Sequence, residues 1–221
     1  MFRVVTIERE YGCGGGGVAA QLAERLGWKL WDHLLTEEIA RTAQVDSAAV
    51  MRCDERMDSP FHRLAKTFWR GSYERSAPLG SHIFDTDRMV AMMQDTMNRI
   101  AQEGNAVIVG RGGPYFLRES ADAFHVFLYA PRAEKIRRTM GDGNSQEQAE
   151  ELVDSVDRER AAYIKHYFGA EWPTRSLYHL MMNTAVGNEA VVRTILDTMR
   201  LVEGRPKATD YELPKVPASS H

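Results

Sequence analysis

Short apolar segments alternate with longer amphipathic segments along most of the chain. Runs typical of buried parallel strands occupy residues 3–8, 28–32, 105–110 and 124–130, and residues 180–183 give a weaker indication of a fifth strand. The segments between them repeat apolar residues every three to four positions, as Val18, Leu22 and Leu26 do before Gly27, which is typical of a helix that ends at glycine. Strands that alternate with helices predict an α/β fold of three layers, a parallel sheet of about five strands with helices on both faces.

The chain divides into one domain and a tail. Its 221 residues suffice for one α/β domain with a sizeable core, which we place at residues 1–203. Within this domain, residues 71–87 form the clearest loop, because Gly, Ser, Pro and Asp are concentrated there. Residues 204–221 are polar and contain prolines, so we predict a mobile tail.

Composition and charge exclude several classes of protein. A net charge of -3 provides no broad basic surface, so binding to a nucleic-acid polymer is not expected. No apolar run approaches the length of a membrane span, and Glu8 and Glu10 interrupt the N-terminus too early for a secretory signal. The two cysteines, Cys13 and Cys53, indicate no disulfide framework, so we predict a cytoplasmic protein. The composition leaves a homo-oligomer open.

A glycine-rich segment follows the first predicted strand and allows two interpretations. The letters GCGGGG satisfy G-x-G-x-x-G at Gly12, Gly14 and Gly17, and Asp32 stands where a dinucleotide-binding fold places its ribose-binding acid. A nicotinamide cofactor is therefore one hypothesis. Three residues, 9–11, separate the strand from the first glycine, however, and such a wider loop favours a P-loop that wraps an anion with its backbone N–H groups.

The segment departs from the P-loop pattern at its end, where G-K-[ST] is expected. When the pattern is aligned on Gly14, Gly15 stands at the lysine position and Gly16 or Gly17 at the hydroxyl position. The backbone amides of Gly12, Cys13 and the following glycines remain available to hold a phosphate. The alternative is a tight turn that binds nothing. Five glycines in six residues argue against it, because each adds to the entropic cost of folding.

The predicted helix after the fourth strand, PRAEKIRRTM, is rich in cations. Its apolar residues, Ala133, Ile136 and Met140, predict the buried face of that helix. On a helical wheel Arg137 lies beside this face and Arg138 points away from it. Arg137 is therefore the stronger candidate for binding an anionic ligand.

Two further arginines lie where a ligand would bind. Arg111 directly follows the third strand, so we expect it at the carboxyl edge of the sheet, where α/β proteins bind ligands. In the helix QEQAEELVDSVDRERAAYIKHY, Arg160 falls in the middle of the apolar face, Asp157 at its edge and Arg158 on the solvated side. A buried arginine needs a partner. Either a carboxylate such as Asp32 or a ligand phosphate would serve.

Several of these segments resemble the cytidylate kinase-like proteins, which are of the nucleoside monophosphate kinase type. The resemblance extends over most of residues 3–202. It is carried by TIEREYGCGG, LAERLGWKLWD, AVIVGRGG, FHVFLYAPRAEKIRR, VDRERAAYIKHYFGAEW and LMMNTAVGNEAVV. It implies a P-loop NTPase-type fold, with a helical segment at about 45–87 that covers the acceptor and a lid-like region at about 137–165.

The resemblance also implies roles for single residues. Cytidylate kinases carry G-R-D where this chain has Gly110, Arg111 and Gly112, and their arginine contacts the acceptor phosphate. An arginine- and aspartate-rich motif on their late helix contacts both substrates, and its nearest counterparts here are Asp157, Arg158 and Arg160. The helix after the fourth strand borders the lid, which favours Arg137 and Arg138 as ligands.

The resulting hypothesis is ATP-dependent phosphorylation of a nucleoside monophosphate similar to CMP or dCMP. Arg9 would replace the missing lysine, the loop amides would hold the β-phosphate, and Asp32 would assist acceptor binding. Arg137 and Arg160 would stabilise the transferring group, with Mg²⁺ held by the nucleotide and water more than by protein. The departures, which are the absent lysine, Gly112, and Asp32-His33-Leu34 in place of D-S-G, leave a second hypothesis open. It is a non-catalytic protein that binds a nucleotide or phosphometabolite.

Overall fold

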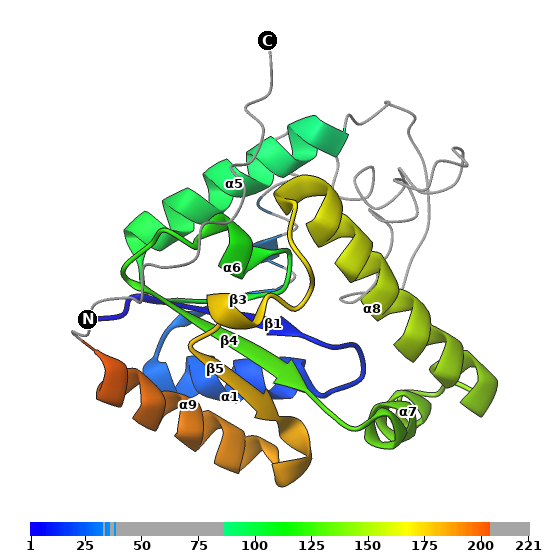
Figure 1. Cartoon of the computed structure of the whole chain (residues 1–221). Coiled ribbons are helices and arrows are strands. Elements are labelled where there is room, and N and C mark those ends of the chain that lie inside the picture. The colour runs from blue at the N-terminus through cyan, green and yellow to red at the C-terminus, as the bar shows by residue number, and fades with distance from the viewer. Residues whose placement is uncertain (33, 36–37, 39–85, 204–221) are drawn as a thin grey trace.

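The computed structural model describes residues 1–32, 34, 35, 38 and 86–203 (Figure 1). Five strands and six α-helices are defined in these residues. The strands are β1 Val4–Arg9, β2 Lys29–Trp31, β3 Ala106–Val109, β4 Ala123–Tyr129 and β5 Leu180–Asn183. The helices are α1 Gly15–Leu26, α5 Thr86–Glu103, α6 Gly113–Phe116, α7 Arg132–Gly141, α8 Gln146–Phe168 and α9 Asn188–Val202. Two 3₁₀ turns, Arg175–Leu177 and Thr184–Val186, flank β5.

All five strands pair in parallel, in the order β2-β3-β1-β4-β5. The central strand β1 is buried along its whole length, with Val4 opposite Ala106 on one side and Ala123 on the other. The predicted parallel sheet of about five strands is confirmed. The fifth strand, which the sequence indicated only weakly, pairs with β4 through Leu180 and the three residues after it.

Helices cover both faces of the sheet, as Figure 1 shows, with α1 and α9 on one side and α5, α6 and α8 on the other. Alternate residues of β1 face opposite layers: Val5 and Ile7 pack in the core that contains Leu22 and Ile195. Val4 packs in the core that contains Met97. Because apolar side chains fill both interfaces, the predicted three-layer arrangement is confirmed.

The connections that leave β1 and β3 meet at the carboxyl edge of the sheet. The chain leaves β1 at Arg9 into the glycine loop, residues 10–14, and leaves β3 at Val109 into Gly110–Gly112. Strands β3 and β4 flank β1, so the chain diverges to both sides at this point, which is where open parallel sheets bind their ligands. A functional site is therefore expected at this edge of the sheet.

Two predicted segments fall largely or wholly outside the described residues. The acceptor-covering segment at about 45–87 is described only at its last two positions, which begin α5. The tail 204–221 is not described at all. In the part of the chain that the structure describes, no helix combines the length and the apolar character needed to cross a membrane.

Candidate functional site

The glycine loop turns sharply and lies directly against α7. Gly12 and Gly14 have φ angles of 72° and 79°, in the left-handed region that favours glycine. A Cβ atom added at Gly12 would stand 2.8 Å from the Thr139 Oγ1 and 2.9 Å from the Lys135 carbonyl oxygen. Glycine is required here both by the backbone conformation and by the contact with α7.

Three of the glycines in the loop and in the first turn of α1 face solvent. Gly14, Gly16 and Gly17 are exposed, and a Cβ atom added at Gly16 would meet nothing within 4 Å. Because α1 begins at Gly15, this exposed stretch coincides with the N-terminus of the helix, whose free N–H groups favour anions. The start of α1 is therefore open at Gly16, whereas Arg138 and Asn188 lie close to Gly14 and Gly17.

Arg9 occupies the space beside Gly15, the residue that the sequence pattern aligns with the P-loop lysine. Its Cδ atom lies 2.8 Å from the point where a Gly15 Cβ would stand, and its Nη1 atom lies 2.8 Å from the corresponding point at Gly110. The buried Arg9 side chain thus extends from the start of α1 towards the loop after β3. Its guanidinium group, through Nη2, is 3.8 Å from the Asp32 Oδ2.

Arg111 reaches the same carboxylate from the other side. Its Nη1 is 3.6 Å from the Asp32 Oδ1, and its side chain is 4% exposed. Burial lowers the pKa of the Arg111 guanidinium to about 10, against the attraction of Asp32, so the group remains charged at neutral pH. Asp32 therefore lies between two buried arginines, Arg9 and Arg111.

The backbone around Arg111 is unusual. Gly110, Arg111 and Gly112 are consecutive residues with φ angles of 67°, 60° and 69°. A non-glycine residue in this region costs on the order of 1–3 kcal/mol, and such strain is typical of functional sites. The two glycines permit the turn that directs the Arg111 side chain inward.

Arg160, which lies on α8, contacts the end of β1 next to the glycine loop. Its Nη1 donates hydrogen bonds to the Arg9 carbonyl oxygen at 2.8 Å and to the Asp157 Oδ1 at 3.2 Å. The backbone N–H of Tyr11 donates to the same Asp157 oxygen at 2.8 Å. The predicted burial of Arg160 on the inner face of the helix is confirmed. Its carboxylate partner is Asp157; the Asp32 considered earlier contacts Arg9 and Arg111 instead.

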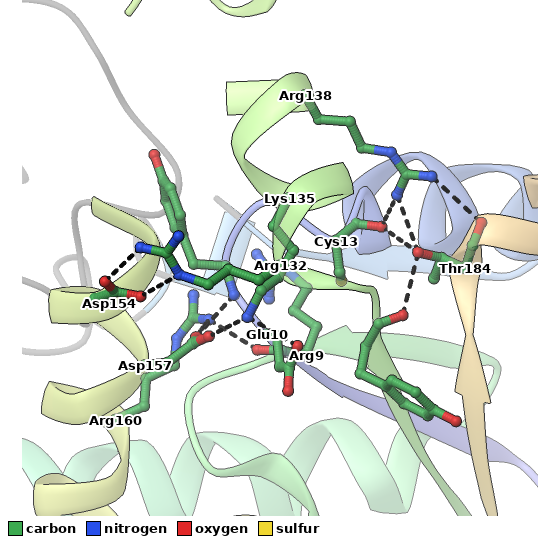
Figure 2. A network of polar contacts seen from close by, with 12 residues as sticks. Arg9, Glu10, Cys13, Arg132, Lys135, Arg138, Asp154, Asp157, Arg160 and Thr184 are labelled. Atoms are coloured by element: carbon green, nitrogen blue, oxygen red, sulfur yellow. Dashed lines mark hydrogen bonds and ion pairs between the residues drawn. The ribbon is translucent and has the colours of Figure 1, made fainter. Parts of the chain in front are cut away.

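The sequence reasoning missed Lys135 and Glu8. Lys135 is on α7, and Figure 2 shows its side chain directed towards Asp157 on α8, with its Nζ 2.9 Å from the Glu10 Oε2 and 3.2 Å from the Asp157 Oδ2. Glu8 is buried, and its Oε2 has no hydrogen-bond partner in the described part of the chain. Burial raises the pKa of the Glu8 carboxyl, although Arg160 and Arg9 favour the charged form. Glu8 directly precedes Arg9, and Lys135 lies two residues before Arg137. Nearness to these two candidates was the only sequence signal for either residue.

The orientation expected for α7 is wrong. Arg137 is 71% exposed and pairs with Glu134 on the surface. Arg138, which was expected to point away, is 24% exposed. It donates hydrogen bonds to the Cys13 carbonyl oxygen and to the Thr184 hydroxyl (Figure 2). Arg138 is therefore the arginine of this helix that contacts the glycine loop.

The cause of this error lies in what α7 packs against. Its buried residues are Lys135 and Thr139, whereas Met140 is exposed. The helix lies on the polar backbone of the glycine loop, so its inner face carries groups that bond to carbonyls and carboxylates. An apolar face marks the inside of a helix only where the helix packs on an apolar core.

The remaining candidates differ in position. Arg158 is exposed, as expected from the helix pattern. Cys13 is buried, and burial raises the pKa of its thiol, so it is an unreactive small residue under the loop. No group of three His, Cys, Asp or Glu side chains within the described ranges is arranged to hold a metal ion.

The strand order, the glycine loop between β1 and α1, and the arginines around it define the P-loop kinase type of α/β fold. The model of the cytidylate kinase-like family matches residues 4–186, so the chain belongs to that family. Membership of a kinase-like family favours the P-loop interpretation over a nicotinamide cofactor. Asp32, the residue on which the nicotinamide hypothesis depended, contacts Arg9 and Arg111.

Solved structures share this fold over nearly the whole chain. An uncharacterized protein from Eubacterium ventriosum matches with a TM-score of 0.66 and 20% identity, covering 91% of this chain and 99% of its own. Shikimate kinase from Acinetobacter baumannii, in complex with shikimate, matches with a TM-score of 0.50 and 16% identity, covering 93% and 97%. Shikimate kinase from Bacteroides thetaiotaomicron matches with 0.50 and 13%, covering 89% and 98%. A comparison with curated proteins found no match.

Proposed function

We propose that the chain is a phosphotransferase that uses ATP to phosphorylate a small acceptor bearing a phosphate group, a nucleoside monophosphate of the CMP or dCMP kind. One observation carries the proposal: Arg9, Arg111 and Arg160 arrive from three separate segments at one edge of the sheet, beside an exposed glycine loop. Phosphoryl transfer requires positioning and neutralisation of charge more than covalent chemistry, and this arrangement supplies both. Membership of a kinase-like family supports the same reading.

The donor would bind at the glycine loop. The amides of Gly12–Gly17 and the N-terminus of α1 would hold the β-phosphate, because consecutive backbone N–H groups at a helix start attract anions. Arg9 would take the part of the lysine, since its side chain already fills the space beside Gly15. ATP, with Mg²⁺ held mainly by its phosphates and water, supplies the group that is transferred.

The acceptor would bind between Arg111 and Asp32. Arg111 would hold the acceptor phosphate, and Asp32 would accept a hydrogen bond from the acceptor or from a metal-bound water. An acceptor phosphate oxygen would form the new bond to the γ-phosphorus, while the bond from that phosphorus to the β–γ bridging oxygen breaks with its electron pair leaving on ADP. Arg160, oriented by Asp157, would neutralise charge on the transferring group.

The two arginines of α7 and the exposed arginine of α8 enter this mechanism unequally. Arg138 lies against Cys13 and Gly14, so it would support the donor site. Arg137 would have to leave Glu134 before it could reach a phosphate. Arg158 faces solvent. We therefore assign the supporting role to Arg138 and leave Arg137 and Arg158 outside the mechanism.

A second function is favoured by the pairing of the charges. Arg160 is already satisfied by Asp157 and the Arg9 carbonyl, and Lys135 by Glu10 and Asp157. Neither Gly16 nor Gly17 offers the hydroxyl that binds Mg²⁺ in P-loop enzymes. Both features suit a protein that binds a nucleotide or phosphometabolite without transferring a group.

A coupled assay with ATP and each of CMP, dCMP, UMP and AMP, run beside calorimetric titration with ATP, separates these functions. For the phosphotransferase we expect turnover with at least one acceptor, and a loss of about 10²–10³ in rate in Arg111→Ala, the range typical of removing one preorganised charged donor. The Arg193→Ala variant, which removes an exposed arginine from α9, is the matched control. ATP binding without turnover would identify the non-catalytic protein. Absence of both would overturn the nucleotide assignment.

A further inference from the structure

Lys135 is unusual among the lysines of the structure. Its side chain is 10% exposed, whereas Lys29 and Lys165, the other lysines in the described residues, lie on the surface. A lysine buries its ammonium group only with compensation, because removing the charge from water is costly. The groups around Lys135 must therefore compensate for the burial of its charge.

These surroundings are the glycine loop itself. The Lys135 carbonyl oxygen and Cβ lie 2.9 Å and 3.2 Å from the point where a Gly12 Cβ would stand. Its Nζ contacts Glu10, the first residue after β1, and Asp157, which accepts the Tyr11 N–H. The ammonium group therefore lies beside the first residues of the loop, between α7 and α8.

The charge of Lys135 persists despite its burial. Burial disfavours the ammonium form, but the hydrogen bond to Glu10 and the attraction of Asp157 outweigh it and raise the pKa of Lys135 above its ordinary value. A permanent cation thus contacts a loop whose own lysine position is Gly15.

The two carboxylates that hold Lys135 are fixed to different degrees. Asp157 is also bound by the Tyr11 N–H and by Arg160. The Glu10 carboxylate is 26% exposed and contacts only Lys135 among the residues that the structure describes. An incoming polyphosphate would therefore displace Glu10 more readily than Asp157.

We propose that Lys135 supplies from α7 a second phosphate-binding cation in addition to Arg9, and that the Glu10 carboxylate occupies the place of the phosphate on Lys135 until a nucleotide binds. The inference rests on the proposed nucleotide binding and adds a ligand to it. Lys135 lies on α7, the helix that follows β4, about 120 residues after position 15 in the sequence. The fold would nevertheless bring its ammonium group to the same phosphates. Glu10 is then a competitor of the nucleotide and not a ligand.

Two substitutions that should change nucleotide affinity in opposite directions test the proposal. Calorimetric titration with ADP and ATP would measure Kd for the wild type, Lys135→Met and Glu10→Gln. We expect Lys135→Met to weaken binding about 10- to 100-fold, the range of a charge-assisted hydrogen bond. We expect Glu10→Gln to strengthen binding severalfold, because it removes the competing carboxylate. A purely structural ion pair would make both substitutions weaken binding together.

Arg132→Met is the matched control. Arg132 and Asp154 form an exposed ion pair, at 2.8 Å, between the same two helices (Figure 2). This variant should leave Kd unchanged if the effect of Lys135 is direct. Thermal melting of each variant identifies a folding defect. If Lys135→Met does not fold, the direction of the change in Kd in Glu10→Gln still tests the proposal.

The outcomes separate this inference from the proposed function. A wild type that binds neither nucleotide overturns both. A wild type that binds, together with an unchanged Kd in Lys135→Met, a weakened Kd in Glu10→Gln, or equal weakening in Arg132→Met, overturns only the role given to Lys135.

Discussion

The Cδ atom of Arg9 lies 2.8 Å from the point where a Cβ atom of Gly15 would stand. Arg9, at the end of β1, and a side chain at position 15 therefore exclude each other. We propose that Arg9 takes the space that a lysine at position 15 would need. Placing a lysine there should consequently damage the protein.

We expect Gly15→Lys to destabilise the fold by about 1–3 kcal/mol, the usual cost of forcing extra atoms into a packed site. Urea denaturation would measure the free energy of unfolding. Gly16→Ala, one residue further along the same helix, should be neutral or stabilising, because nothing lies within 4 Å of its Cβ position and alanine favours helices.

The same relationship predicts coupling between the two positions. Arg9→Ala removes the atoms that collide with a side chain at position 15. The double variant Arg9→Ala, Gly15→Lys should therefore be more stable than the sum of the two single changes predicts. Strict additivity in a double-mutant cycle would contradict the steric account.

Sequence patterns predicted the central strands because β1 and β3 are short, wholly buried runs, whereas β2 and β5, at the edges of the sheet, are only partly buried. Strand β1 is the clearest example: its six residues are all buried, so no polar position interrupts the pattern. The apolar face of α8 likewise placed Arg160 inside and Arg158 outside, since that helix packs partly on the core through Ile164 and Phe168.

The site was harder to foretell, because its contacts join segments far apart in the chain. Nothing local indicates that Lys135 meets Glu10, or that Arg138 meets Cys13. The apolar pattern of α7 was misleading, because this helix packs on peptide groups and not on an apolar core. Only the packing of α7 on the loop reveals which of its cations matter.

Arg137 and Arg138 should behave differently, although they are neighbours. Arg138→Ala removes hydrogen bonds to Cys13 and Thr184, so we expect a loss of about 1.5–3 kcal/mol in the free energy of unfolding and weaker ATP binding. Arg137→Ala removes only an exposed pair with Glu134 and should cost less than about 1 kcal/mol. Urea denaturation and ATP titration of both variants would decide. The reverse order would restore the orientation first expected from the helix pattern.

Glu8 should make stability depend on pH. Burial raises the pKa of its carboxyl in the folded protein above the ordinary value of 4.5, so the folded state binds this proton more tightly than the unfolded chain. The resulting stabilisation is complete below pH 4.5 and is lost as the pH rises through the folded pKa. We expect the stability of Glu8→Gln, relative to the wild type, to increase as the pH rises above the ordinary carboxyl value of 4.5.

Urea denaturation at a series of pH values would measure this difference. The comparison with the wild type removes the contributions of all other groups. Glu151→Gln, at an exposed position of α8, provides a matched loss of charge. A relative stability of Glu8→Gln that stays level or falls with rising pH would show that Glu8 is ionised without penalty in the fold.

Arg111 combines backbone strain with a proposed role in binding, and two substitutions separate them. Arg111→Gly relieves a φ angle of 60°, whereas Arg111→Ala retains much of that strain, and both remove the guanidinium group. We expect Arg111→Gly to be the more stable of the two by roughly 1 kcal/mol in urea denaturation. Both should raise the KM of the acceptor, by about 10-fold or more, because its phosphate loses a charged partner. If the two variants lost stability equally but kept the acceptor KM, the strained arginine would serve the fold through Asp32 and not the acceptor.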